Sequence, residues 1–253
     1  MIVYCKSRIR IAEMHFNEKG APPPVDVVRY RFRTEPMEGG RSAELHTILI
    51  DLTQDQDQLL AGMNDNTRHQ IRKGGRSELT VEFSEKPDLA RTEEFFAFWR
   101  EFALLKGMPD VNRDRLLGMR EHGALALSRV RDQGGETLVW HCYVYTKEWT
   151  RLVYSASLFR KEADKARTTL TGIANRYLHW QDMLRFREMG LTTYDMGGWY
   201  AGQTNGAKLK INYFKEGFGG AVVPVFTTDL GITLKGSLAI RLRDLKIRWQ
   251  GGE

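Results

Sequence analysis

The sequence is poor in cysteine and contains no pattern that would place several metal ligands together. Its two cysteines, Cys5 and Cys142, lie far apart in a chain of 253 residues. This excludes a framework of disulfide bonds and is typical of a protein from a reducing compartment. There is also no cysteine pair, no His-x-x-x-His and no carboxylate cluster at ligand spacing. We therefore expect no metal site.

Long apolar runs are missing as well. The first residues, MIVYCKSRIRIAEMHF, are interrupted by Lys6, Arg8 and Arg10. A signal peptide needs an unbroken apolar stretch after its basic start, and a transmembrane helix needs about 20 apolar residues. Neither occurs, so we expect a cytoplasmic protein without a transmembrane segment. The sequence also lacks a Walker loop and a Rossmann glycine motif, and we expect no cofactor.

The composition is that of a globular enzyme with an excess of basic residues. Hydrophobic residues make up 42% and charged residues 28%, and 38 Lys and Arg against 32 Asp and Glu give a net charge of +6. A chain of this length buries a core without disulfides or metals. The positive charge favours an anionic partner such as nucleic acid, a phosphorylated substrate or a membrane surface.

The order of expected elements indicates an α/β protein. Strands are expected at residues 47–52, 79–83, 124–131, 137–146, 150–158 and 221–226, with another ending at Tyr194-Asp195. Helices are expected at about 55–75, 88–106, 113–121, 168–189 and 205–213. Residues 1–45 are expected to be irregular apart from two extended stretches, and residues 229–249 to form a basic amphipathic helix. Tight breaks join the middle strands, which predicts a mixed rather than a purely parallel sheet.

Three segments carry a family resemblance. Residues 51–76 place a basic run after Arg-x-x-Ile-Arg, residues 177–199 lead to Tyr-Asp-x-Gly-Gly, and residues 211–220 contain Phe-Lys-x-Gly-Phe-Gly. Taken together, in this order and spacing, they resemble the FemABX family of peptidoglycan-bridge aminoacyl transferases. The resemblance covers residues 46–226. It implies a GNAT-like acyltransferase fold and a reaction in which an amine attacks an activated acyl group.

The resemblance also implies a domain division. Family members usually carry two GNAT-like domains, and the three motifs belong to the second. We therefore assign residues 1–45 to an N-terminal segment or a reduced first domain, residues 46–226 to a GNAT-like Fem-type transferase domain, and residues 227–253 to a basic amphipathic C-terminal helix or tail. The first domain helps to bind the muropeptide in the family, and here we expect it to be missing or reduced to residues 1–45. The acceptor can therefore be another amine, on a small molecule, a sugar or a peptide.

Lys215 and Asp195 are the candidate catalytic residues. The match to the family's Phe-Lys pair implies that Phe214 and Lys215 lie near the donor or the developing oxyanion, where a fixed ammonium stabilises negative charge. The alternative for Lys215 is a solvated lysine. Asp195 can orient or deprotonate the amine, or it can simply cap a turn. Gly197 and Gly198 would permit a close ligand approach or a positive-φ turn.

Donor binding is expected from two basic stretches. Arg68, Arg72 and Lys73 lie on one helix edge in a run without acids, and Arg160 and Arg167 precede the long helix. Either group can contact phosphates. The alternative for the helix edge is an ordinary solvated face.

Three functions remain open at this point. The leading hypothesis is transfer from aminoacyl-tRNA in cell-wall, surface-polysaccharide or peptide-metabolite modification. An acyl-CoA-dependent GNAT N-acyltransferase is the second, although residues 159–172 lack the glycine loop that cradles pyrophosphate in that class. A non-catalytic basic RNA-binding module is the third. His141 and His179 carry no motif and are expected to be packed residues, as is the aromatic run from Phe95 to Phe102.

Overall fold

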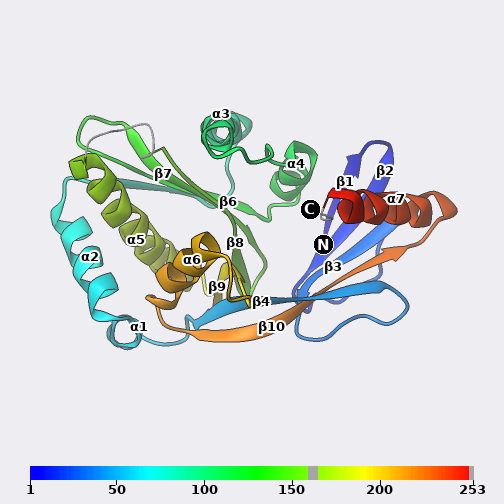
Figure 1. The fold of residues 1–253 in the computed structure, drawn as a ribbon, viewed down its shortest axis with the longest axis horizontal. Coiled ribbons are helices and arrows are strands. Elements are labelled where there is room, and N and C mark those ends of the chain that lie inside the picture. The colour runs from blue at the N-terminus through cyan, green and yellow to red at the C-terminus, as the bar shows by residue number, and fades with distance from the viewer. Residues whose placement is uncertain (159–164, 251–253) are drawn as a thin grey trace. The chain divides into compact units, whose positions relative to one another are not determined.

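The computed structural model describes residues 1–158 and 165–250, and it divides into two compact units (Figure 1). Unit 1 comprises residues Met1–His46, Asn112–His122 and Pro224–Glu253. Unit 2 comprises Thr47–Val111 and Gly123–Val223. The N-terminal and C-terminal segments that we expected to be separate therefore lie in one unit, together with a helix from the middle of the chain.

Unit 1 is a small sheet with two helices. Its strands are β1 (Ile2–Lys6), β2 (Ile9–His15), β3 (Val27–Arg33) and most of β10 (Ala221–Gly231), in that spatial order, and its helices are α4 (Arg113–Glu121) and α7 (Leu234–Gln250). Strand β2 is antiparallel to β1 and parallel to β3, and β10 is antiparallel to β3. The pairing of Asp229 with Arg29 keeps the chain extended as far as Gly231. The helix predicted to begin at residue 229 therefore begins at Leu234.

Unit 2 contains the larger part of the sheet. Its strands lie in the order β4 (Arg41–Asp51), β9 (Thr193–Trp199), β8 (Trp149–Ser157), β7 (Thr137–Tyr145), β6 (Leu125–Arg131) and β5 (Thr80–Ser84). Strand β4 begins in unit 1, and its last residues belong to unit 2. Strands β5 to β8 are antiparallel neighbours, whereas β8 and β9 are parallel. The predicted mixed α/β sheet is confirmed.

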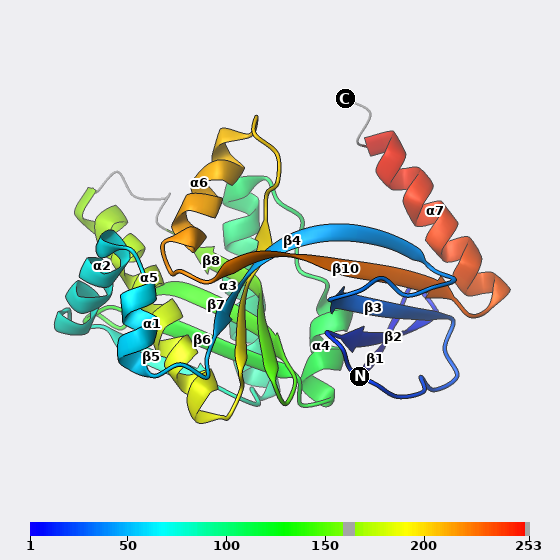
Figure 2. The ribbon, with the colours of Figure 1, turned by 90° about the horizontal axis from the view of Figure 1, so that it is seen from below.

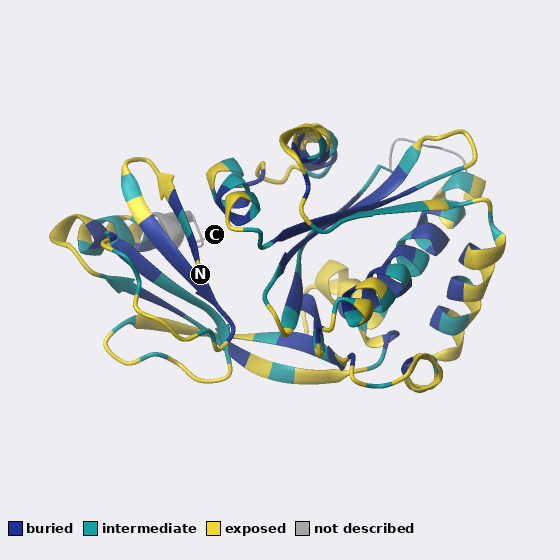
Figure 3. Ribbon diagram, turned by 180° about the vertical axis from the view of Figure 1, so that it is seen from behind, coloured by how far each residue is buried: buried dark blue, intermediate teal, exposed yellow. Residues whose placement is uncertain are grey.

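Five helices accompany this sheet in the described part of unit 2. They are α1 (Gln56–Gly62), α2 (Asp65–Arg76), α3 (Leu89–Lys106), α5 (Lys165–Glu188) and α6 (Gly206–Glu216). Helix α5 contributes Trp180, Met183 and Phe186 to the main core, which it shares with strand residues such as Tyr143 and Tyr194. Figure 3 shows the buried residues concentrated on the strands and on one side of α5. On α3, Phe95, Phe96, Trp99 and Phe102 are buried, so the aromatic run is core as expected.

The single helix predicted over residues 55–75 is wrong, because the structure has two helices there. Asp55 caps α1, as expected, and Asn64 caps a second helix by accepting a hydrogen bond from the Thr67 amide at 2.8 Å. The Asn64 amide donates to the Gly217 carbonyl at 3.0 Å, a contact across more than 150 residues of sequence. Gly74 lies inside α2, where a side chain would collide with Tyr177 of α5.

Candidate active site

The candidate site is built where the parallel strands β8 and β9 stop pairing. Their register runs from Trp149 opposite Thr193 to Arg151 opposite Asp195, and both strands continue past that point. Gly197 has φ +79°, a conformation that glycine adopts without strain. A Cβ atom at Gly197 would lie 2.9 Å from the Leu152 carbonyl oxygen. Glycine is thus required here both for the positive φ and for the close approach of two strands.

Asp195 lies at this point of separation and is fully buried. One carboxylate oxygen accepts hydrogen bonds from the Gly197 amide at 2.7 Å and from the Thr47 hydroxyl, and the other accepts from Arg151. Arg151 Nη1 also donates to Thr47 Oγ1 at 3.2 Å. The bond to Gly197 is the turn-capping contact that the sequence left as an alternative. The carboxylate thus holds three parts of the chain together.

Lys215 approaches the same place from the last turn of α6. Its Nζ donates to the Gly198 carbonyl at 2.6 Å and lies 3.7 Å from the position that a Cβ atom on Gly197 would occupy. The side chain is half-buried. Desolvation, together with the nearby Arg151 charge, lowers the pKa of Lys215 to about 8, although Asp195 acts in the opposite direction. Lys215 is therefore a cation that is held near a carboxylate but hydrogen-bonds a backbone carbonyl.

The sequence placed Lys215 after the end of a helix, whereas the structure places it within one. Helix α6 was predicted to end near residue 213, but it continues to Glu216. Its N-terminus is capped by Asn205, and Asn212 ties its middle to Tyr200 by two hydrogen bonds of 2.7 and 2.9 Å. These contacts fix the helix against the chain that follows β9. They thereby set where the Lys215 ammonium lies.

A buried polar network supports the other side of β9. His141 donates to Asp182 at 2.8 Å, Tyr143 donates to the same carboxylate oxygen at 2.6 Å, and the hydroxyls of Tyr143 and Tyr194 are 2.7 Å apart. His179 Nδ1 lies 2.8 Å from the Tyr194 hydroxyl. Both histidines are buried, as expected for packed residues. Because successive residues of a strand face opposite sides, the network fixes Tyr194 while Asp195 faces the candidate site.

Phe214 lies next to this network and is partly buried. Its ring centroid is 5.8 Å from that of His179 and 5.5 Å from that of Phe218, and the Arg176 guanidinium lies 4.5 Å from it. Burial holds the pKa of His179 well below its usual range, with smaller contributions from His141 and Lys215. A neutral imidazole therefore packs against the aromatic residues that flank Lys215. Contact between Phe214 and a donor stays a proposal.

Only part of the predicted basic helix edge is available for contacts with phosphate. Arg68 donates to the carbonyls of Leu60 and Met63 and pairs with Asp65, so it closes the C-terminal end of α1. Arg72 and Lys73 are exposed on α2. Arg68 is thus a structural residue in this conformation, and the other two remain candidates for contacts with phosphate.

The second predicted basic group behaves differently. Arg160 lies outside the described residues. Arg167, at the start of α5, pairs with Asp132 at 2.7 Å and with Glu136 at 2.6 Å. Because carboxylates already neutralise its guanidinium, Arg167 is a weaker candidate for phosphate binding than Arg72 or Lys73.

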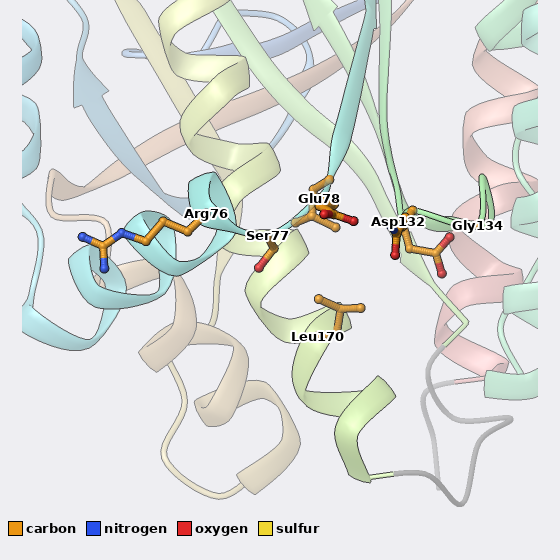
Figure 4. Close-up of a pocket in the computed structure, with 8 residues that line it drawn as sticks. Arg76, Ser77, Glu78, Asp132, Gly134 and Leu170 are labelled. Atoms are coloured by element: carbon orange, nitrogen blue, oxygen red, sulfur yellow. The ribbon is translucent and has the colours of Figure 1, made fainter.

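A pocket of about 540 Å³ lies between the end of α2, the β6–β7 turn and α5. Figure 4 shows Glu78, Asp132 and Leu170 around it, with the Arg76 side chain directed away. Asp132 is already paired with Arg167. Two carboxylates at its wall make this pocket unsuitable for an anionic donor. Lys215 and Asp195 are not among its lining residues.

Sequence reasoning missed Thr47 and Arg151. Thr47 begins the unit 2 part of β4, and nothing in its neighbourhood distinguishes it. Arg151 did carry a signal, since it is a charged residue within the strand sequence WTRLVYSAS. A buried arginine requires an acidic partner, and Asp195 in the following strand is that partner.

No group of three or more His, Cys, Asp and Glu side chains in residues 1–158 and 165–250 is arranged to hold a metal ion. No helix in the same ranges is long and apolar enough to cross a membrane.

Comparison with solved structures defines the fold of the chain. It matches FemX with a TM-score of 0.59 at 15% identity, over 78% of this chain and 63% of FemX. It also matches the C-terminal domain (DUF2156) assigned to a lysylphosphatidylglycerol synthetase from Agrobacterium fabrum, with a TM-score of 0.56 at 16% identity over 88% and 72% of the two chains. L-PGS from Bacillus licheniformis gives a TM-score of 0.52 at 13% identity over 86% and 72%.

These likenesses confirm the GNAT-like α/β fold that the motifs implied. The chain spans less than two thirds of the length of FemX. No family model matches the sequence, and no curated protein matches it. The shared property is therefore the fold, and activity has to be argued from the site.

Proposed function

We propose that the protein is an amide-forming acyltransferase in which Lys215 acts at the point where β8 and β9 separate. The observation that carries this proposal is the position of the Lys215 ammonium on the Gly198 carbonyl, with a pKa of about 8. A fixed cation in a partly desolvated site stabilises a developing negative charge more strongly than it would in water. The structural neighbours FemX and the lysylphosphatidylglycerol synthetase domain support an acyltransferase of GNAT-like fold at a coarse level.

The reaction needs little covalent participation from the protein. A neutral amine attacks the acyl carbonyl carbon, negative charge gathers on the carbonyl oxygen, and the ester or thioester bond then breaks. The amine nitrogen loses one proton, and the departing oxygen or sulfur gains one. Lys215 as an ammonium stabilises the oxyanion, and its pKa also allows it to exchange that proton near neutral pH.

Asp195 is proposed as a positioning residue rather than a base. Its carboxylate is fully buried and already accepts from Gly197, Thr47 and Arg151. A base has to reach the proton that it removes, and this carboxylate has no oxygen without a protein partner. Its function in the proposal is to fix the turn at Gly197 and, through it, the carbonyl that Lys215 contacts.

Aminoacyl-tRNA is the proposed donor, and acyl-CoA is the second candidate. The exposed Arg72 and Lys73 on α2 favour a polyanion, because a tRNA presents phosphates far from its reactive end. The proposed acceptor is an amine on a small molecule, a sugar or a peptide, in cell-wall, surface-polysaccharide or peptide-metabolite chemistry.

The donor is tested by titrating the protein with aminoacyl-tRNA and with acetyl-CoA at several salt concentrations. We expect tRNA binding to weaken steeply with salt and the slope to fall by roughly one for each phosphate contact removed in Arg72→Ala/Lys73→Ala. The matched control, Lys6→Ala/Arg10→Ala, removes two exposed basic residues of unit 1 and should leave the slope unchanged.

Two outcomes would reject this donor. Salt-tolerant binding of acetyl-CoA without tRNA binding would favour the acyl-CoA enzyme. Salt-sensitive tRNA binding without transfer to any amine would favour a non-catalytic RNA-binding module.

A further inference from the structure

Helix α7 of unit 1 exposes its leucines. Leu234, Leu238, Leu242 and Leu245 have exposed fractions of 92%, 58%, 57% and 56%. Their spacing of four, four and three residues places them along one face of the helix. An amphipathic helix of a globular protein normally turns such a stripe toward the core. In α7 the stripe is turned outward.

The opposite face of α7 is attached to unit 1 by polar groups. Arg243 pairs with Asp229 of β10, and Asp244 pairs with Arg41 of β4. Gly236 lies against the chain at Asp26, where an added Cβ atom would overlap the carbonyl oxygen. These contacts determine the rotation of the helix about its axis. The outward direction of the leucines therefore follows from named ion pairs and from one close backbone approach.

The segment that carries the leucines is also rich in basic residues. Residues 234–250 contain five basic residues and one acid, which gives 5 − 1 = +4; the basic residues are Lys235, Arg241, Arg243, Lys246 and Arg248. The acid, Asp244, is 9% exposed and is held between Arg41 and Arg243. Arg241 is exposed, and Lys235 is exposed while its ammonium pairs with Asp26 at 3.3 Å. The surface thus combines a leucine stripe with cations and shows no free carboxylate from this helix.

We propose that α7 binds the surface of an anionic lipid bilayer, with the leucine stripe inserted below the headgroups and the basic residues beside the phosphates. A helix with a continuous apolar face and a basic flank has the features required for lying in the membrane interface. The stripe from Leu234 to Leu245 is about 16 Å long. Figure 2 shows no other described helix or strand of unit 1 on the outer side of α7.

A second copy of the chain is the less favourable occupant. Two copies related by a twofold axis would bring the same +4 segment against itself, and like charges oppose such contact. An anionic bilayer supplies the opposite charge and a flat apolar layer. This inference does not depend on the reaction proposed above.

The test uses the full chain and co-sedimentation with vesicles. One set contains phosphatidylcholine alone, and the other contains about 30% phosphatidylglycerol. We expect binding to the anionic vesicles, weakened at high salt, and at least about a tenfold weaker partition for Leu238→Gln/Leu242→Gln. Both positions are more than half exposed, so thermal unfolding of this variant should match that of the parent.

The matched control is Leu104→Gln/Leu105→Gln, which removes two exposed leucines from α3 of unit 2. This variant should bind anionic vesicles as the parent does. Equal binding by the α7 variant and the parent would overturn the proposal, and so would equal binding to both vesicle types. Absence of vesicle binding, with self-association in sedimentation velocity that the α7 variant abolishes, would overturn it in favour of a second copy.

Discussion

Units 1 and 2 each bury a carboxylate, which contacts three arginines in unit 1 but one arginine, with a lysine nearby, in unit 2. In unit 1, Glu13 is fully buried and accepts from Arg115 at 2.7 Å and from Tyr4 at 2.9 Å, with Arg29 and Arg31 within 4 Å. In unit 2, Asp195 is held by Arg151, Thr47 and its own turn.

The two clusters differ in whether they contain a charged side chain that is available to act on a substrate. Burial alone would raise the pKa of Glu13, but Arg115, His15 and Arg31 together lower it to about 2. The Glu13 carboxylate is thus held by several protein groups and has the properties of a structural element. In unit 2, Lys215 hydrogen-bonds a carbonyl and has a pKa of about 8. A cation with this pKa can stabilise negative charge on a substrate or exchange a proton with it.

The largest expected effect is on the stability of unit 1. Arg115→Ala leaves Glu13 buried without its closest partner, and breaking a buried ion pair in this way costs about 3–5 kcal/mol. Urea unfolding should show this loss in the free energy of unfolding of unit 1. Adding Glu13→Gln to the same variant should recover part of it, since no unpaired carboxylate then remains. A loss below about 1 kcal/mol would mean that the pair behaves like a surface ion pair.

A somewhat smaller effect is expected on acidification. Burial lowers the pKa of His15 to about 3, and Glu13 has a pKa of about 2, so both groups have lower values in the folded than in the unfolded chain. Below pH 6.5 the unfolded chain takes up protons at His15 first and at Glu13 from about 4.5. The folded state is therefore destabilised relative to the unfolded chain as the pH falls below about 6.5, and further as it falls below about 4.5.

This predicts a decrease in the free energy of unfolding of unit 1 by roughly 2–4 kcal/mol between pH 7 and pH 4. In His15→Gln the free energy of unfolding should begin to decrease only at about pH 4.5, because the Glu13 carboxylate is then the group of this pair that still takes up a proton. The measurement is urea unfolding at each pH, for the parent and the variant. A decrease that begins at the same pH in both would contradict the assignment to His15.

The smallest expected effect sharpens the description of unit 2. Arg151 lowers the pKa of Lys215 and Asp195 raises it. Asp195→Asn should therefore move that pKa below 8, and Arg151→Met should move it above 8. The pH dependence of trace acetylation of Lys215, followed by mass spectrometry, reports the value. Shifts in the same direction for both variants would show that Lys215 does not sense these two charges.

Elements could be predicted from the sequence where their own apolar side chains recur at the spacing of a helix or a strand. The long helix expected over 168–189 is α5, Lys165–Glu188, because Ile173, Tyr177 and Trp180 recur at helical spacing along one face. The break between α1 and α2 could not be predicted, since it depends on Gly217 accepting from Asn64 and on Arg68 closing α1. The extension of β10 to Gly231 likewise depends on pairing with β3.

In the candidate site, too, features that depend on local sequence could be predicted and features that depend on contacts elsewhere in the chain could not. Gly197 and Lys215 lie in short motifs, and the structure brings them together with Asp195. The availability of Arg167 could not be predicted, because its partner Asp132 lies 35 residues away in the sequence, whereas Arg68 is held by Asp65 within its own motif.

The most direct measurement is the rate of acyl transfer by the parent and by Lys215→Met, with labelled aminoacyl-tRNA and labelled acetyl-CoA offered to a panel of amines. Lys210→Met is the matched control, because Lys210 lies on the same helix and is exposed. The account predicts transfer by the parent, transfer on the order of a hundredfold slower for Lys215→Met, and an unchanged rate for the control. Equal rates for the parent and Lys215→Met, with both proteins folded, would contradict it.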